Sequence, residues 1–186
     1  MGKTVIEKIV EHNTGRSVKP GDIVTVNVDR VMIHDIFIPF VAEKFKEMGF
    51  EKLWDPDKVV LIYDHLVPAS QLDDTRHFHV GDAFAAKYGM TRVHRSDGIC
   101  HQLMTEAGYV KPGDVAFGTD SHTTTYGCVG AFSSGMDARN QFHPTIQIEQ
   151  AAAILHQYQG REISMASTAA RHRESAAMDR ILTPAA

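Results

Sequence analysis

The sequence predicts an α/β domain with a mostly parallel sheet and flanking helices. Segments rich in β-branched residues alternate with segments of helical periodicity. Val59–Tyr63 is a continuous apolar run, which is typical of a strand covered on both faces. Polar residues follow several of the predicted strands. Because ligands bind beyond the carboxyl ends of parallel strands, these residues are the first candidates for function.

Length and composition fit one ordinary globular domain. The 186 residues are 43% hydrophobic and 23% charged, with a net charge of −4. There is no basic stripe, so a nucleic-acid partner is not expected. No apolar run has membrane-spanning length and no signal peptide is visible, so we expect a cytoplasmic protein. Two cysteines, Cys100 and Cys128, are too few for a disulfide framework or a CxxC zinc site.

The N-terminal part begins with a predicted helix. Thr4 and Glu7 form a capping box, and Ile6, Ile9 and Val10 give the helix an apolar face. It should end near 13–15. The next expected elements are a turn at Lys19–Asp22, a strand at Ile23–Val28, and a helix at Pro39–Met48 with Phe40, Val41, Phe45 and Met48 on its apolar face.

The alternation continues to about Gly135. The expected elements are the strand at Val59–Tyr63, a helix at Asp74–Lys87, a strand at Thr91–His94, a helix at Cys100–Ala107, a second Lys-Pro-Gly-Asp turn at 111–114 and a strand at Val115–Phe117. We therefore expect one domain over residues 1–135. Residues 136–186 differ in character. The stretches Ile146–Gln159 and Ile163–Leu182 are helical by propensity but have thin apolar faces, so we expect a helical or poorly ordered tail.

The dipeptide Asp64-His65 follows a predicted buried strand. A carboxylate can orient an imidazole and stabilise its protonated form, which suits a general acid. Adjacent residues leaving a strand point in different directions, so the two need not touch each other, and each could instead pair with a partner from another strand end. Taken alone, the dipeptide is better explained as a solvated polar pair.

The segment Gly118–Gly127 is the strongest sequence signal. It places an acid, several hydroxyls and an imidazole between glycines after a predicted strand. Such a segment can offer N–H groups and hydroxyls to a substrate carboxylate, and Asp120 and His122 can carry protons. The alternative is a Thr-rich surface loop, but loops seldom combine this chemistry with flanking glycines.

Two further histidine-containing segments are candidates. His101 opens a predicted helix and is interpreted as functional, whereas Cys100 beside it is interpreted as a buried small residue. A helix N-terminus would also suit a reactive thiol. His77 and His79 resemble a pair of metal ligands, but without a third ligand nearby a solvated helix face is the better interpretation. We therefore predict no metal ligands in this chain.

Taken together, Asp64-His65, Gly98–Gln102 and Gly118–Gly127 resemble the aconitase superfamily, most of all the large-subunit type of isopropylmalate dehydratase with its homoaconitase and dimethylmalate dehydratase relatives. The resemblance spans roughly Gly2–Gly135 and implies an aconitase-like α/β/α domain, here incomplete. It implies a hydro-lyase of leucine biosynthesis acting on a hydroxy-dicarboxylic or tricarboxylic acid such as 3-isopropylmalate. It also implies a small swivelling-domain subunit as the partner.

The resemblance assigns roles to seven residues. The acid system that protonates departing hydroxide and its proton network are implied to be Asp64, His65, His101, Asp120 and His122. Substrate-binding side chains are implied to be Ser121 and His34.

The cofactor implied by the resemblance is a [4Fe–4S] cluster whose three cysteine ligands lie in a later domain. Cys100 and Cys128 do not fall in that motif, and two thiolates are too few. The expectation is therefore an N-terminal portion of a large subunit, inactive alone, with a truncation, frameshift or gene-model error near Met136; a remodelled natural protein is the alternative. A non-catalytic carboxylate-binding module and a small enzyme using His and Asp with a mononuclear metal are the alternatives.

Overall fold

The computed structural model describes residues 2–22, 24–136 and 163–164. Its centre is a fully parallel five-stranded sheet in the order β4-β3-β2-β5-β6. The strands are β2 (Arg30–His34), β3 (Val59–Ile62), β4 (Val93–His94), β5 (Val115–Gly118) and β6 (Phe132–Gly135). The predicted α/β class with a mostly parallel sheet is confirmed.

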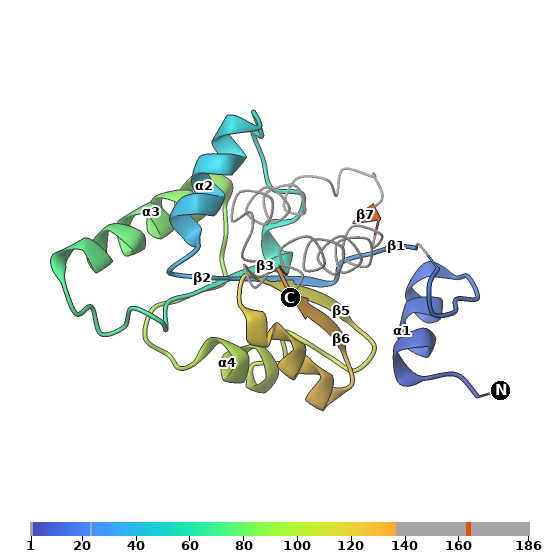
Figure 1. Cartoon of the computed structure of the whole chain (residues 1–186). Helices are drawn as coiled ribbons and strands as arrows, with labels where there is room; N and C mark the ends of the chain where they lie inside the picture. Colours follow the sequence, from blue (N-terminus) through green and yellow to red (C-terminus); the bar gives the residue numbers. More distant parts are fainter. Residues whose placement is uncertain (1, 23, 137–162, 165–186) are drawn as a thin grey trace, which may run out of the picture.

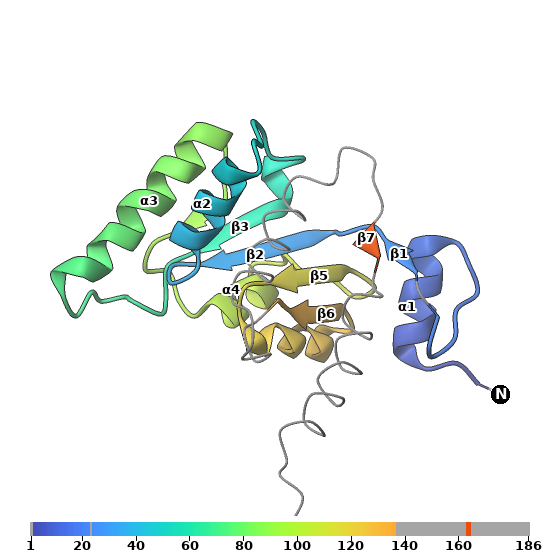
Figure 2. The same cartoon turned by 45° about the horizontal axis from the view of Figure 1, so that its top comes forward.

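Helices cover both faces of the sheet (Figures 1 and 2). One face carries α2 (Ile38–Glu47) and α3 (Leu72–Tyr88), and the other carries α4 (Cys100–Glu106) and the 3-10 segment η2 (Ser121–Val129). The remaining helical elements are α1 (Val5–Thr14), beside β1, and the 3-10 turn η1 (Pro56–Lys58). Within the residues that the structure describes, no helix has the length and apolar character needed to cross a bilayer.

The central strand divides the core into two. Successive side chains of a strand point to opposite faces of its sheet. Val31 and Ile33 of β2 belong to the cluster that includes Phe45 of α2, whereas Met32 belongs to the cluster that includes Met104 of α4. All five side chains are buried. Burying an aromatic ring such as Phe45 contributes on the order of 2 kcal/mol, so this two-sided packing holds the central strand firmly.

The first predicted strand is much shorter than expected and lies outside the main sheet. Within the described residues 24–28, Thr25–Val26 alone form a strand, β1, which pairs antiparallel with β7 (Ile163–Ser164). The backbone of Asn27 is instead bonded to the side chain of Asn13, its N–H donating to Oδ1 at 2.7 Å and its carbonyl accepting from Nδ2 at 2.8 Å. These bonds satisfy the backbone groups that a longer strand would have paired.

Most predicted helices and turns are confirmed. The Thr4 capping box is present, and α1 ends at Gly15 in the left-handed conformation. Both Lys-Pro-Gly-Asp turns form, closed by the bonds from Asp22 N–H to Lys19 O and from Asp114 N–H to Lys111 O.

Three details of the sequence interpretation are wrong. Phe40 and Met48 were expected on the buried face of α2, but they are 45% and 40% exposed. Phe40 points away from the buried residues Ile38, Val41 and Phe45, and Met48 follows the last helical turn. The helix expected from Ile163 does not begin there, because Ile163–Ser164 pair as a strand with β1. The rest of the tail prediction lies outside the described residues.

Candidate active site

The candidate site lies at the carboxyl ends of β2, β3 and β5. The chain leaves β2 toward α2 on one face and enters β5 from α4 on the other, so the connections diverge at β2. By the general rule for α/β proteins, ligands bind in a crevice outside the strand ends at such a divergence. The structure gathers all seven predicted residues around this point: His34, Asp64, His65, His101, Asp120, Ser121 and His122.

His65 lies between carboxylates. Its Nδ1 is 2.7 Å from Oδ1 of Asp64, and its Nε2 is 3.5 Å from Oδ2 of Asp120. His65 thus contacts both its neighbour Asp64 and a partner from the end of another strand, Asp120. The Asp64 hydrogen bond raises the pKa of His65 despite its partial burial, and the charges of Asp35 and Asp120 act in the same direction. His65 is thus favoured in its protonated form.

A bond from α4 fixes the orientation of Asp64. The backbone N–H of Cys100, the first residue of α4, donates to Oδ2 of Asp64 at 2.6 Å. Burial by itself would raise the pKa of Asp64, but the hydrogen bonds from His65 and Cys100 outweigh it and the pKa is lowered. Asp64 is therefore an anion that bridges the end of β3 and the start of α4.

Asp120 contacts three imidazoles, those of His65, His101 and His122. Its Oδ1 is 2.7 Å from Nε2 of His101 and 3.1 Å from Nδ1 of His122, and it caps η2 by accepting the N–H of His122 at 2.7 Å. Burial opposes the anion, but the hydrogen bonds from His122 and His101 lower the pKa of Asp120 to about 2. Ser121 presents its Oγ 3.3 Å from Nδ1 of His122. Asp120 thus stays ionised and links β5 to α4.

His101 has a second partner that sequence reasoning missed. The hydroxyl of Tyr126 lies 3.3 Å from Nδ1 of His101, and the Tyr126 side chain is fully buried against α4. Burial raises the pKa of Tyr126, so it acts as a neutral phenol. Because the carboxylate of Asp120 only accepts, Nε2 of His101 carries a proton. The ring orientation of His101 is fixed from both sides.

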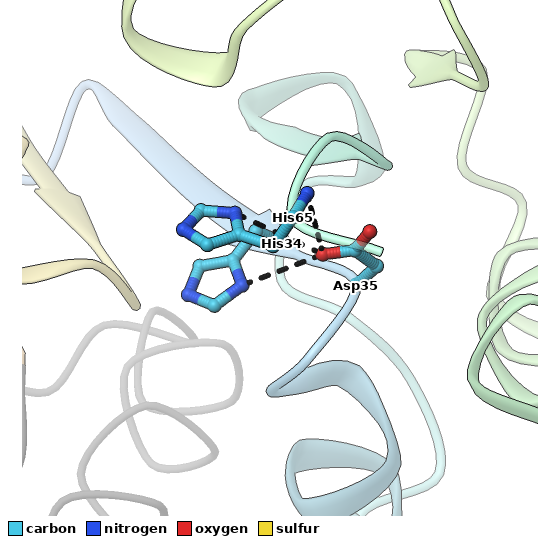
Figure 3. A group of neighbouring side chains, drawn as sticks. All are labelled: His34, Asp35 and His65. Atoms are coloured by element: carbon cyan, nitrogen blue, oxygen red, sulfur yellow. Dashed lines mark hydrogen bonds and ion pairs between the residues drawn. The ribbon is translucent and has the colours of Figure 1, made fainter. Parts of the chain in front are cut away.

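His34 is buried under His65. The two rings stack with centroids 4.0 Å apart and planes 20° apart (Figure 3). The backbone N–H of His34 donates to Oγ1 of Thr119 at 3.1 Å, and its Nε2 lies 3.3 Å from the Thr119 carbonyl oxygen. His34 is 2% exposed, so its geometry is that of a support for His65. The predicted substrate contact of His34 stays a prediction.

Sequence reasoning gave no role to Asp35 or Thr119. Asp35 follows β2 directly and is fully buried, with its carboxylate facing both His34 and His65 (Figure 3). The sequence did contain a signal for Asp35, because the polar pair His34-Asp35 follows the apolar residues 31–33. These residues form β2, a strand that was not predicted. The ring of His77 is also engaged, since its Nδ1 lies 3.1 Å from the carbonyl oxygen of Asp35, whereas His79 is exposed.

The described residues do not fit a cysteine-held iron–sulfur cluster. Cysteine thiolates hold such a cluster, usually four of them and three in the family that the sequence resembles, and the chain has two cysteines. Cys100 is fully buried, and burial followed by the adjacent Asp64 raises the pKa of its thiol. Cys128 is exposed at the end of η2. The reactive-thiol alternative for Cys100 is therefore not supported.

Histidines and acids do gather closely enough to be considered for a metal ion. Three groups bring one donor atom each within 4.8 Å of one another: His34 with Asp35 and His65, Asp64 with His65 and Cys100, and His101 with Asp120 and His122. The carboxylates in these groups already accept backbone N–H bonds. Each carboxylate also lies beside an imidazole, so the same groups can hold and move protons.

Comparison with known proteins identifies relatives of this chain. Residues 7–146 match the aconitase family (aconitate hydratase). The 3-isopropylmalate dehydratase large subunit 1 of Methanopyrus kandleri is 42% identical over 137 residues, which is 73% of this chain and 33% of that protein. The 3-isopropylmalate dehydratase large subunit of Methanoregula boonei is 40% identical over 136 residues, with the same coverage. The chain spans about a third of the length of the curated relatives it matches.

Proposed function

The chain belongs to the aconitase family, and from this premise we propose that it supplies the acid–base side of a hydro-lyase acting on a hydroxy-dicarboxylic acid such as 3-isopropylmalate. Relatives bearing the name 3-isopropylmalate dehydratase large subunit support this substrate. The observation that carries the proposal is the position of His65, held on Asp64 through Nδ1 and facing Asp120 through Nε2.

This position suits the departure of hydroxide from carbon. The leaving oxygen needs a proton, and an imidazolium beside carboxylates can donate one at neutral pH. His65 is partly exposed, so a substrate can reach it from the crevice. Asp64 and Asp120 offset the charge of the ring before transfer. Asp120 also couples His65 to His101, which gives a route for the proton to be replaced.

The start of η2 suits a substrate carboxylate. Ser121 is partly exposed and His122 is exposed, so a hydroxyl and an imidazole face the solvent side of the crevice. These are the donor groups that a carboxylate accepts from. The predicted roles of Ser121 in binding and of His122 in proton transfer are kept as part of this proposal.

The iron–sulfur cluster and the second subunit belong to the same proposal. When bound, the family's cluster supplies a Lewis acid for the substrate hydroxyl. The two cysteines here do not fit that cluster, so we propose that its thiolates, and a small swivelling-domain subunit, come from outside these 186 residues. On this proposal the 186-residue chain alone is inactive.

The proposal is tested by transferring substitutions into a complete large subunit assembled with its small subunit. His65→Ala and His122→Ala should each lower turnover of 3-isopropylmalate on the order of 10²-fold or more. His79→Ala is the matched control, because His79 is exposed on α3 and should change turnover little. Equal losses at all three positions would show a general loss of folding and remove support for the assigned roles.

A further inference from the structure

Asp35 is a buried carboxylate at the end of the central strand. Its side chain is 0% exposed. Its backbone is also tied on both sides, because its N–H donates to the Ile62 carbonyl at 3.1 Å and Nδ1 of His77 lies 3.1 Å from its own carbonyl oxygen. Burying a carboxylate is costly unless it is fully hydrogen-bonded or paired with charge. Its partners therefore indicate what it does.

The first set of partners is the backbone that follows β3. Oδ2 of Asp35 accepts the N–H of Leu66 at 2.8 Å, and Oδ1 accepts the N–H groups of Ile36 at 3.0 Å and of His65 at 3.3 Å. Two of these three donors belong to the segment that carries His65. The carboxylate thereby fixes the direction in which the chain leaves β3.

The second set of partners is the stacked pair of rings. Nδ1 of His34 and Nδ1 of His65 lie 3.7 Å and 3.8 Å from the same oxygen, Oδ1 of Asp35 (Figure 3). The two rings lie one over the other, and both turn this nitrogen toward the carboxylate. One buried anion therefore faces two imidazoles at once.

Among the described residues, five ionisable groups lie close to His65: Asp64 from the same loop, Asp120 from the end of β5, Asp35 and His34 from the end of β2, and the Cys100 thiol from the start of α4. The side chains of Asp35, Asp64 and Asp120 are 0%, 7% and 13% exposed. Solvent screens a deeply buried charge less than an exposed one. At 3.8 Å, the Asp35 carboxylate therefore acts on the His65 ring more strongly than an exposed carboxylate at the same distance would.

We propose that Asp35 is a positioning residue, which orients His65 through the backbone after β3 and supplies a buried counter-charge to its ring. Asp35 does not itself touch the crevice, since its side chain is fully buried. The proposal rests on the proposed function only where it gives His65 a proton to transfer. The coupling between Asp35 and the His65 ring is independent of any substrate.

The test is an NMR titration of the His65 ring in the full chain, comparing the wild type with Asp35→Asn. Asparagine keeps the size and one acceptor oxygen but removes the charge, so the His65 midpoint should move to lower pH. Asp74→Asn is the matched control. Asp74 is also a buried carboxylate, and it accepts the N–H groups of Ser70 and Gln71 at the start of α3. This control should leave the His65 midpoint where the wild type has it.

An unchanged His65 midpoint in Asp35→Asn, or a change no larger than in Asp74→Asn, would overturn the proposal and leave Asp35 as a structural contact alone. If Asp35→Asn does not fold, the wild type provides the test. The Ile36 amide donates to Asp35 and lies far from His65 in sequence, so its resonance should titrate with the His65 midpoint. No response at that midpoint would overturn the proposal too. Normal turnover in His65→Ala would instead reject the proposed function, with the titration result unaffected.

Discussion

The carbonyl oxygen of Asp120 fills the space in which a side chain at Gly135 would begin. A Cβ at Gly135, the last residue of β6, would overlap this oxygen and press on Cα of Ser121. Both contacts are with backbone, which cannot move aside as a flexible side chain can. The absence of a side chain at Gly135 therefore lets η2 start directly against the sheet, with Asp120 within reach of α4.

Gly135→Ala should therefore displace the start of η2 and weaken the Asp120–His101 contact. We expect a loss of unfolding free energy on the order of 1–3 kcal/mol, typical of overpacking. Urea denaturation of the full chain measures it. Gly127→Ala is the control, since a Cβ there meets nothing within 4 Å. Equal stability of the two variants would show that the sheet and η2 can separate without cost.

Sequence patterns predicted the elements whose own residues determine them. Val59–Ile62 was predicted because four consecutive apolar residues suit a strand buried on both faces. The central strand β2 was missed because the preceding run, residues 23–28, has the stronger β-branched signal. That run is cut short by the bonds between Asn27 and Asn13, a contact between distant residues. β6 was missed because its Ser133 and Ser134 carry no strand signal and depend on pairing with β5.

The same distinction holds for the site. Most of its candidate residues were predicted because they follow strands, which is a local property. His101 was predicted because it opens a helix, and His34 was named through the family resemblance. The contacts of these residues were not predicted, since the orientation of Asp64 depends on the N–H of Cys100, 36 positions away. Tyr126 was missed because its segment is rich in Thr and resembles an exposed loop, whereas packing against α4 buries it. Asp35 was missed because two of the three N–H groups that stabilise its buried carboxylate, those of His65 and Leu66, come from the segment after β3.

Asp120 should make stability depend on pH in the acid range. Its pKa is lowered from 3.8 to about 2 on folding. The Asp120 carboxylate therefore contributes on the order of 2 kcal/mol to the free energy of unfolding. This contribution is fully present above pH 3.8 and is lost as the pH falls toward 2. Asp120→Asn should be less stable than the wild type near pH 6, and the difference should shrink between pH 4 and pH 2. Denaturant unfolding across this range measures it, and a difference that stays constant would contradict the assignment.

Ser121→Ala should weaken binding of 3-isopropylmalate to the full chain. Loss of one hydrogen bond to a carboxylate costs on the order of 1–2 kcal/mol, or roughly a 5- to 30-fold rise in Kd. The measurement is an NMR titration that follows the amides of Gly118–Gly127. Thr124→Ala, which removes an exposed hydroxyl from the same segment, should change Kd little. Ligand-induced shifts confined to other segments would count against a carboxylate site here.

The two cysteines should differ sharply in their rate of alkylation. Cys128 is exposed, whereas Cys100 is fully buried and the pKa of its thiol is raised by burial and by Asp64. Because only the thiolate reacts, iodoacetamide should label the native chain once, at Cys128. The second label should appear only as α4 opens or the chain unfolds, so its rate should rise with denaturant. Mass spectrometry of digested samples locates the labels, and Cys128→Ser should remove the fast one. Rapid labelling of Cys100 in the native chain would mean that the start of α4 is open. The hydrogen bond from the Cys100 N–H could then not be what orients the Asp64 carboxylate.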